Sequence, residues 1–200
     1  MKFLMPALKL VIFMTLLLGL AYPLAMTALS QIFFPQSANG EWLYRGGQNV
    51  GSKLIAQNFE KPEYFWPRPS AVGFNPLPSG GSNLSWVSED LKKAVEERRI
   101  RLKKAHPDSS IEPPSELLFT SASGLDPHLS PEAVKYQAAR VASARKMNIQ
   151  EVNQLIAELT EKRSFGLLGE PTVKVLVLNL ALDRAQGIDS APQFVPSETK

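Results

Sequence analysis

The sequence predicts an α+β protein in which one N-terminal transmembrane helix is followed by a small extracytoplasmic domain of mixed helices and strands. Three observations predict this class: a long uncharged apolar run near the N-terminus, three segments with helix-capping residues after residue 88, and only a few short strand-like runs. We divide the chain into a cytoplasmic N-terminus (1–9), a transmembrane helix (10–34), an external domain (35–184) and a tail (185–200) that we expect to be flexible.

The apolar run extends from Leu10 to Phe34 without a charged residue. At about 1.5 Å per residue, residues 10–30 alone span a hydrocarbon core of about 30 Å. A cleaved signal peptide is the alternative, because Ala28-Leu29-Ser30 resembles a cleavage site. The apolar run is roughly twice as long as that of a signal peptide, and this length favours an uncleaved anchor.

Basic residues predict the orientation of this helix. Lys2 and Lys9 precede the apolar run, and Arg45 is the first basic residue after it. Because cytoplasmic flanks carry the excess of Lys and Arg, we expect the N-terminus in the cytoplasm and the later domain outside, which in a bacterium is the periplasm. The protein would then be a single-pass protein of the inner membrane.

Small residues recur on one face of the predicted membrane helix, namely Ala21, Ala25 and Ala28. Such a face lets another transmembrane backbone approach closely, and these alanines are candidate contacts with a partner. Gly19, Tyr22 and Pro23 are expected to interrupt the helix near its middle, where neighbouring helices would satisfy the freed backbone groups. A generic anchor in which Ala and Gly occur incidentally is the alternative.

Composition excludes several classes of protein. The 200 residues include no Cys, so disulfide-stapled mini-proteins, thiolate zinc sites and Cys-dependent enzymes are excluded. The 22 basic residues barely outnumber the 19 acidic ones, and without Lys2 and Lys9 the remainder is nearly neutral. The charge balance therefore predicts no nucleic-acid partner.

The external domain shows few strand signals and clear helix signals. Trp42–Tyr44 and Leu54–Ile55 are expected as strand pieces, whereas residues 61–88 contain so many Pro and Gly residues that they predict a structured loop. Helices are predicted after the capping residues Ser88, Ser130 and Asn148. Residues 172–178 are predicted to form a buried strand, with a helix through Asp183 as the alternative.

Two histidines limit the possible catalytic chemistry. Asp126 and His128 place an acid near a base, with serines at 121, 123 and 130 nearby, so a membrane-anchored envelope enzyme is the alternative function. No G-x-S-x-G pattern supports a nucleophile, and one Asp with one His is too few ligands for a metal site. We therefore expect these two residues to form a turn ahead of the Ser130 helix, and we expect no catalytic or metal-binding residue.

A glycine-rich string at Ser79-Gly80-Gly81-Ser82-Asn83 is a weak nucleotide-binding candidate. Consecutive backbone N–H groups in such a turn can hold an anion. The string lacks the lysine and the flanking elements of a phosphate-binding loop, and the predicted topology places it outside the cytoplasm. We therefore expect no firmly bound cofactor.

Several specific strings, in this order and spacing, resemble one bacterial family. They are GLAYPL (19–24), GSKLIAQ (51–57), YFWPRPSA (64–71), SGGSNL (79–84), TSASGLDPHLSP (120–131), Gln137, Arg140-Val141-Ala142, Arg145, VKVLVLN (173–179) and Leu182-Asp183. They resemble the C subunit of the Kdp potassium-transporting ATPase, the KdpC family, over residues 8 to 183.

The resemblance implies a non-catalytic subunit of a high-affinity ATP-driven potassium uptake complex. Its partners would be a channel-like potassium-translocating subunit, a P-type ATPase subunit and a small single-span peptide, so the other subunits would handle ATP and potassium. The family description calls the C subunit a catalytic chaperone that raises the ATP affinity of the ATPase subunit, and it offers the SGGSNL string as a nucleotide signature.

The YFWPRPSA loop supplies the remaining candidate contacts. Tyr64, Phe65, Trp66 and Arg68 are aromatic and arginine side chains of the kind that dominate protein interfaces. Burial of the aromatic rings within the domain itself is the alternative.

Overall fold

The computed structural model describes residues 3–107 and 109–188, which form two compact units. The first unit ends at Trp42 and the second begins at Leu43; each is described by itself. The tail predicted to be flexible lies outside the described residues from position 189 onward.

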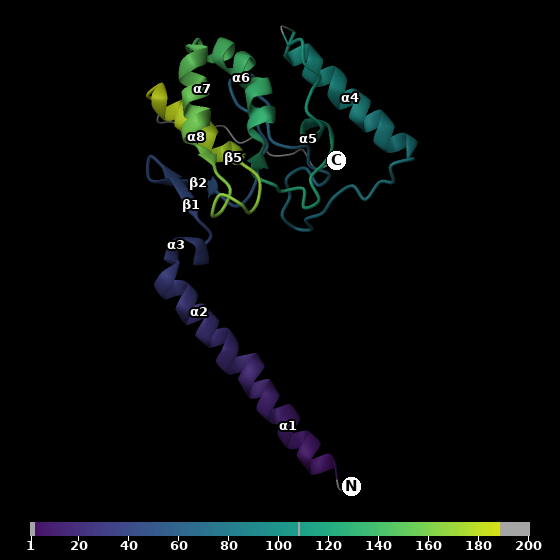
Figure 1. Ribbon diagram of the computed structural model, residues 1–200, viewed down its shortest axis with the longest axis vertical. Helices are drawn as coiled ribbons and strands as arrows, with labels where there is room; N and C mark the ends of the chain where they lie inside the picture. The colour runs from purple at the N-terminus through teal and green to yellow at the C-terminus, as the bar shows by residue number, and fades with distance from the viewer. Residues whose placement is uncertain (1–2, 108, 189–200) are drawn as a thin grey trace. The chain divides into compact units, whose positions relative to one another are not determined.

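The first unit contains one continuous helix of 30 residues, Leu4–Phe33, that is long and apolar enough to cross a membrane (Figure 1). It comprises α1 (Leu4–Leu16), a π-helical turn η1 (Leu17–Ala21) and α2 (Tyr22–Phe33), and the short helix α3 (Pro35–Ala38) follows. At 1.5 Å per residue the long helix measures about 45 Å, more than the hydrocarbon core requires. None of its side chains is buried against the described part of the chain.

The predicted interruption of this helix takes the form of the π turn and not of a break. In this turn the Tyr22 N–H donates to the Leu17 carbonyl, five residues back. The π turn ends at Ala21, two residues before Pro23, which has no N–H to donate and would crowd the preceding turn of a regular α-helix. The widened turn therefore accommodates the proline while the helix continues to Phe33.

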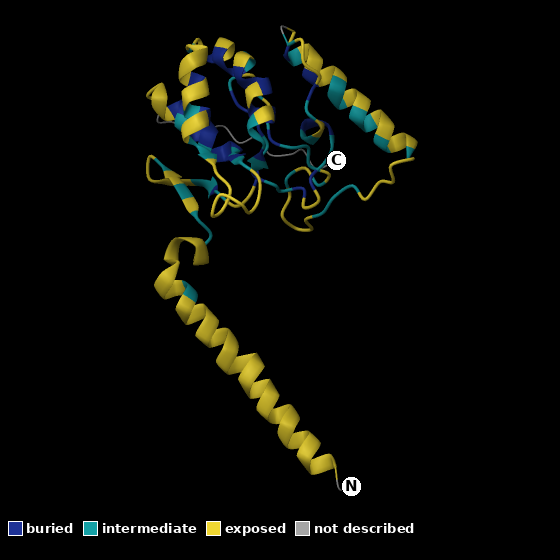
Figure 2. Ribbon diagram, in the orientation of Figure 1, coloured by how far each residue is buried: buried dark blue, intermediate teal, exposed yellow. Residues whose placement is uncertain are grey.

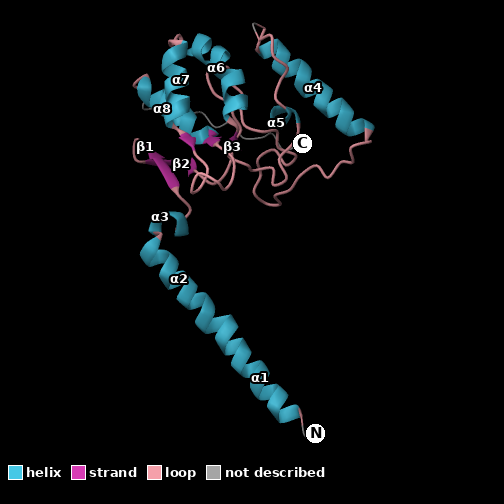
Figure 3. Ribbon diagram, in the orientation of Figure 1, coloured by secondary structure: helices cyan, strands magenta, loops and turns pink. Residues whose placement is uncertain are grey.

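The second unit is an α+β domain, as predicted. Its elements are β1 (Trp42–Arg45), which begins one residue before the boundary, β2 (Gln48–Ser52), α4 (Glu89–Ala105), α5 (Ser115–Leu118), β3 (His128–Leu129), α6 (Pro131–Arg145), α7 (Ile149–Glu158), β4 (Thr160–Glu161), β5 (Thr172–Lys174) and α8 (Val175–Ala185). The strands form a β1–β2 hairpin (Figure 3). The other three form an antiparallel sheet in the order β3-β5-β4. Residues 53–88 contain no helix or strand, which confirms the predicted loop.

The core lies where α6, α7 and α8 gather over the three-stranded sheet (Figure 2). On α7, Val152 and Ile156 lie one turn apart and are both buried. Leu178 and Leu182, one turn apart on α8, are fully buried as well. By contrast, α4 buries only Leu102, so most of its surface faces solvent.

All three predicted helix caps are present. The Ser88 hydroxyl accepts a hydrogen bond from the Leu91 N–H at 3.4 Å, and the Ser130 hydroxyl accepts one from Ala133 at 3.1 Å. The Asn148 side chain accepts one from Gln150 at 2.9 Å. Each cap satisfies a backbone donor that the first turn of a helix leaves free, so the starts of α4, α6 and α7 follow from local sequence alone.

Two strand predictions need correction. Leu54–Ile55 forms a turn, because the Ser52 hydroxyl accepts from the Leu54 N–H at 3.0 Å and the chain bends there. The strand predicted over residues 172–178 ends at Lys174, and the alternative helix is right from Val175 onward. Both faces of this apolar run are buried, so its hydrophobic pattern could not separate a strand from a helix.

Candidate functional site

Two amide side chains hold the loop at residues 64–66 in place. The Phe65 N–H donates to Asn179 Oδ1 at 2.8 Å, and Asn179 Nδ2 donates to the Phe65 carbonyl at 3.0 Å. Gln137 makes the same pair with the backbone of Trp66, at 2.8 and 3.0 Å. Asn179 belongs to α8 and Gln137 to α6, and both side chains are fully buried. Their amide groups bond to the backbone N–H and carbonyl of the loop, as the backbone of a neighbouring strand does in a sheet.

Asp183 on α8 is the centre of a buried charge network. Its carboxylate is 2.8 Å from Arg45 Nη1 and 2.7 Å from Arg145 Nη2, and it accepts from the Tyr64 hydroxyl at 3.3 Å. Its side chain is only 1% exposed. Burial, assisted by the charge of Asp183, raises the pKa of Tyr64, so the phenol keeps its proton. The network joins the β1–β2 hairpin, the loop and the ends of α6 and α8.

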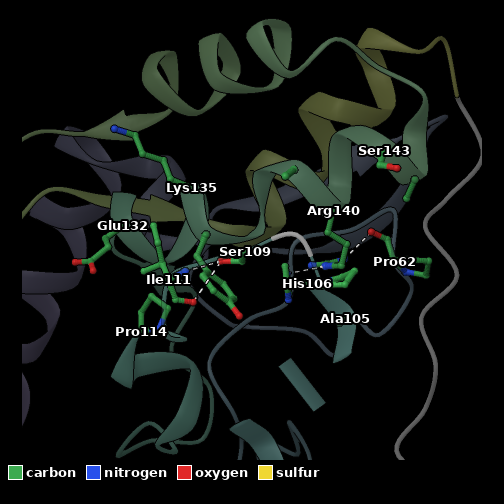
Figure 4. A pocket seen from close by; sticks show the side chains of 14 residues that line it. Pro62, Ala105, His106, Ser109, Ile111, Pro114, Glu132, Lys135, Arg140 and Ser143 are labelled. Atoms are coloured by element: carbon green, nitrogen blue, oxygen red, sulfur yellow. Dashed lines mark hydrogen bonds between the residues drawn. The ribbon is translucent and has the colours of Figure 1, made fainter. Parts of the chain in front are cut away.

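Arg140 fixes the other side of the loop, as Figure 4 shows. Its guanidinium donates to the carbonyls of Pro62 and Tyr64, and its Nε donates to His106 Nε2 at 3.0 Å. Burial lowers the pKa of Arg140 to about 10, with a further contribution from the charge of Arg101, and the group stays charged at neutral pH. Its role is to hold chain segments together, since all three contacts are within the domain.

Both ring nitrogens of His106 are engaged in structural hydrogen bonds. Nδ1 lies 2.7 Å from the Leu102 carbonyl, while Nε2 accepts from Arg140, so the hydrogen-bond network assigns the neutral ring with its proton on Nδ1. Burial lowers the pKa of His106, and the charge of Arg140 acts in the same direction. Because neither nitrogen is free, the geometry gives His106 no role as a general base or a metal ligand.

A cleft of about 760 Å³ borders this cluster, between the end of α4 and the face of α6 (Figure 4). Its lining is largely apolar and includes Pro62, Ile111, Pro114, Tyr136 and Ala139. The Tyr136 hydroxyl is buried and has no hydrogen-bond partner among the described residues. Sequence reasoning did not predict this cleft, because its walls come from three separate parts of the chain, at Pro62, residues 105–114 and residues 132–144.

The loop residues predicted to contact a partner have different surroundings. Phe65 is fully buried and Tyr64 is 9% exposed, so these two rings belong to the core of the domain and are not available as surface anchors. Trp66 is half-buried, and the guanidiniums of Arg140 and Arg101 lie over its ring at 4.2 and 5.0 Å. For Trp66 and Arg68, which are partly accessible, contact with a partner stays a prediction.

The predicted membrane contacts are accessible as well. Ala21, Ala25 and Ala28 are exposed on the long helix. The π turn at Leu17–Ala21 includes the first of them and reshapes the helix next to the other two. Their role in packing against another helix also stays a prediction.

Asp126 and His128 were expected to form a turn, but His128 begins strand β3, and only the Asp126 side chain makes a turn-like hydrogen bond, to the backbone two residues on. Asp126 Oδ1 accepts from the His128 N–H at 3.0 Å and lies 3.3 Å from its Nδ1, while Oδ2 pairs with Arg68 Nη1 at 3.0 Å. Within the described residues no serine hydroxyl hydrogen-bonds to His128. The Ser130 hydroxyl contacts Glu116 and caps α6. The three groups of a hydrolytic triad are therefore not brought together.

The Ser79–Asn83 string packs against the irregular segment at residues 121–124, before β3. The Gly80 N–H donates to the Ser123 carbonyl at 2.9 Å, and a Cβ on Gly81 would lie 3.1 Å from the Ala122 carbonyl. Gly124 has φ +70°, and a Cβ there would meet the Gly80 carbonyl at 2.8 Å. Close approach of two backbones thus explains Gly81 and Gly124 without a bound nucleotide, whereas a Cβ on Gly80 would meet no atom within 4 Å.

Comparison with known proteins identifies the relatives of this chain. Residues 4–184 match the family model described as "KdpC: K+-transporting ATPase, c chain". Proteins named potassium-transporting ATPase KdpC subunit are similar over most of both chains. That of Serratia proteamaculans is 48% identical, covering 92% of this chain and 98% of the relative. Those of Polaromonas naphthalenivorans and Myxococcus xanthus are each 49% identical, covering 92% and 93% of this chain and 96% and 90% of the relatives.

Proposed function

The chain belongs to the KdpC family of potassium-transporting ATPase subunits, and from this premise we propose that it is the single-span, non-catalytic C subunit of a potassium uptake complex. Its partners in this proposal are a channel-like subunit that passes potassium, a P-type ATPase subunit and a small single-span peptide. The chain supports the assembly and activity of these partners, which handle potassium and ATP. The family match over residues 4–184 is the observation that carries the proposal.

Leu4–Phe33 is the segment that crosses the inner membrane in this proposal. The positions of Lys2, Lys9 and Arg45 support an orientation with the N-terminus in the cytoplasm and the domain from Leu43 in the periplasm. The exposed Ala21, Ala25 and Ala28 then face a partner helix within the bilayer, where small residues allow backbones to approach.

The surroundings of the titratable groups support a non-catalytic role. Both nitrogens of His106 are used in hydrogen bonds. Asp126 accepts a hydrogen bond from the His128 N–H and forms an ion pair with Arg68. A general acid or base must reach a substrate proton, which His106 cannot do, and among the described residues no serine hydroxyl hydrogen-bonds to His128 to serve as a nucleophile. The envelope-enzyme alternative has no support from this geometry.

The same geometry supports an indirect effect on ATP. The Ser79–Asn83 string packs on the backbone of residues 122–123, and a periplasmic domain would not meet cytoplasmic ATP. Any effect of this subunit on ATP affinity is therefore transmitted through contacts with the other subunits. Such an effect is a coupling free energy between sites and requires no nucleotide bound to this chain.

Co-purification tests the proposed function. The full chain, tagged at its C-terminus, is purified in mild detergent from membranes of potassium-starved cells, and the co-purifying proteins are identified by mass spectrometry. We expect the channel-like and ATPase subunits in constant ratio to the chain. Its isolation without them, under conditions in which the other subunits co-purify with each other, would contradict the proposal.

A reporter that is active only outside the cytoplasm, fused after Lys200, tests the orientation. We expect activity from the fusion, and no activity from a control fused after Lys9. Cytoplasmic activity of the Lys200 fusion would overturn the topology and restore direct ATP contact as an option.

A further inference from the structure

A second hollow, separate from the cleft beside α6, is lined by three arginines. It encloses about 290 Å³ between residues 58–60, the loop at 66–74 and one face of α4. The guanidiniums come from Arg68, Arg98 and Arg101, and the aromatic part of the lining comes from Phe59, Trp66 and Phe74. Three positive groups on one small hollow, with aromatic rings between them, form an unusual surface for a nearly neutral domain.

The three arginines are not fully neutralised within the domain. Arg101 makes no hydrogen bond or ion pair with any described residue and lies over the Trp66 ring at 5.0 Å. Arg98 donates to the Leu118 carbonyl at 2.8 Å but pairs with no carboxylate among the described residues. Arg68 pairs with Asp126, yet its buried Nε has no partner in the described part of the chain.

Counting charges gives the net charge of the hollow. Glu60 is the one acidic residue in the lining, and Asp126 neutralises Arg68 from outside it. Three arginines less these two carboxylates leave one positive charge, and two further charges nearby, Arg140 over the Trp66 ring and Glu97 acting on Arg98, cancel each other. Burial lowers the pKa of Arg98, which means that its charged form is poorly solvated and would gain from a nearby anion.

We propose that this hollow binds a single carboxylate, presented by an acidic side chain next to an apolar residue on another subunit of the complex. One net positive charge matches a carboxylate and not a dianionic phosphate. The guanidinium fork suits a planar carboxylate, and the aromatic part of the lining accommodates the adjacent apolar side chain. A volume of about 290 Å³ lies at the lower limit of small-molecule sites and suits a side chain better than a nucleotide.

This inference rests on the proposed function, because the carboxylate comes from a partner subunit. The wall of the hollow is already formed in the chain alone. The Ser70 hydroxyl accepts from the backbone N–H groups of Val72 and Phe74 at 3.2 and 2.9 Å and so holds the turn that carries Phe74. Binding therefore requires little ordering of this loop, which favours affinity.

Direct binding is tested on the purified full chain in detergent. The probe is the blocked dipeptide acetyl-Phe-Glu-amide, followed by tryptophan fluorescence because Trp66 lines the hollow. We expect saturable binding of this probe. The affinity should fall about tenfold for acetyl-Phe-Gln-amide, and about tenfold for the variant Arg101→Gln, because each change removes one charged hydrogen bond. Lys93→Gln removes a charge from the same helix outside the hollow and should leave binding unchanged.

Three outcomes would overturn the carboxylate site. These are equal binding of the Glu and Gln probes, tighter binding of inorganic phosphate than of the Glu probe, and unchanged binding in Arg101→Gln. Arg101 is exposed, so its replacement should not unfold the domain, and Arg101→Lys should restore part of the affinity. The melting temperature of each variant checks that the domain stays folded.

Assembly provides the second readout and separates this inference from the proposed function. In the co-purification experiment, we expect Arg101→Gln to lower the yield of partner subunits several-fold at 0.3 M salt relative to Lys93→Gln. Failure of the unmodified chain to retain partners would count against the proposed function. Equal retention by Arg101→Gln and Lys93→Gln would count against the carboxylate contact alone.

Discussion

Replacement of Asp183 by Asn tests whether the buried charge network holds the domain together. The substitution keeps the size of the side chain but removes the charge that Arg45 and Arg145 share at 2.8 and 2.7 Å. The side chains of all three residues are at most 7% exposed, so solvent cannot replace the lost partner. Two buried guanidiniums would remain without a counter-charge.

The expected cost follows from this burial. Removing one partner of a buried ion pair typically costs about 3–5 kcal/mol, because the other charge stays buried and uncompensated. For a domain of this size, each kcal/mol corresponds to about 2–4 °C in melting temperature. We therefore expect the Asp183→Asn domain to unfold roughly 6–20 °C below the unmodified chain.

Asp126→Asn is the matched control for this measurement. It removes a carboxylate that also pairs with an arginine, but the two side chains are 27% and 28% exposed, so the loss should stay below about 1 kcal/mol. Thermal unfolding of the detergent-solubilised full chain, followed by near-ultraviolet circular dichroism, compares the two variants. Equal melting temperatures for Asp183→Asn and Asp126→Asn would refute the reasoning, since burial is the main difference between the pairs.

Three further predictions concern the helix, a cap and a histidine. Ala21→Leu with Ala25→Leu should lower co-purification of partner subunits without reducing membrane insertion, because added volume separates packed helices; normal yield would make the helix a simple anchor. Ser130→Ala should destabilise the domain by about 1 kcal/mol through the lost N-cap of α6, measured by denaturant unfolding. Burial lowers the pKa of His106 below the usual value of about 6.5, so its contribution to stability is lost as the pH falls below about 6.5. His106→Gln, which can still bond Leu102 and Arg140, should reduce the change in melting temperature between pH 7 and pH 5, and an unchanged pH dependence would contradict this.

Features that depend on near neighbours in the sequence were predictable. The caps at Ser88, Ser130 and Asn148 act within three residues, and the apolar run from residue 10, which forms most of the helix Leu4–Phe33, is recognised by its length. Features that depend on distant contacts were not. Val175 begins a helix from which Asn179 reaches Phe65, 114 residues away in the chain. No local sequence pattern predicts that contact.

The sequence identified several residues of the candidate site but did not predict what each of them contacts. The strings quoted for the family resemblance already included Gln137, Arg140, Arg145, Asn179 and Asp183. The structure shows that these five side chains bind the loop at residues 62–66 or each other. The hydrogen bond between His106 and Arg140 could not be predicted, because the two residues lie 34 positions apart in the chain. The aromatic loop looked like an interface for the same reason, since its burial depends on α6 and α8.

Potassium-dependent ATP hydrolysis tests the central claim, that this chain is a non-catalytic subunit, most directly. The complex is purified with the double variant Asp126→Asn/His128→Gln, which removes the acid and the base of the enzyme alternative while keeping much of their hydrogen bonding. Activity is normalised to the amount of this subunit present. Our account predicts a rate within about twofold of the unmodified complex, whereas a loss of roughly a hundredfold with assembly intact would indicate acid–base chemistry in this chain and contradict it.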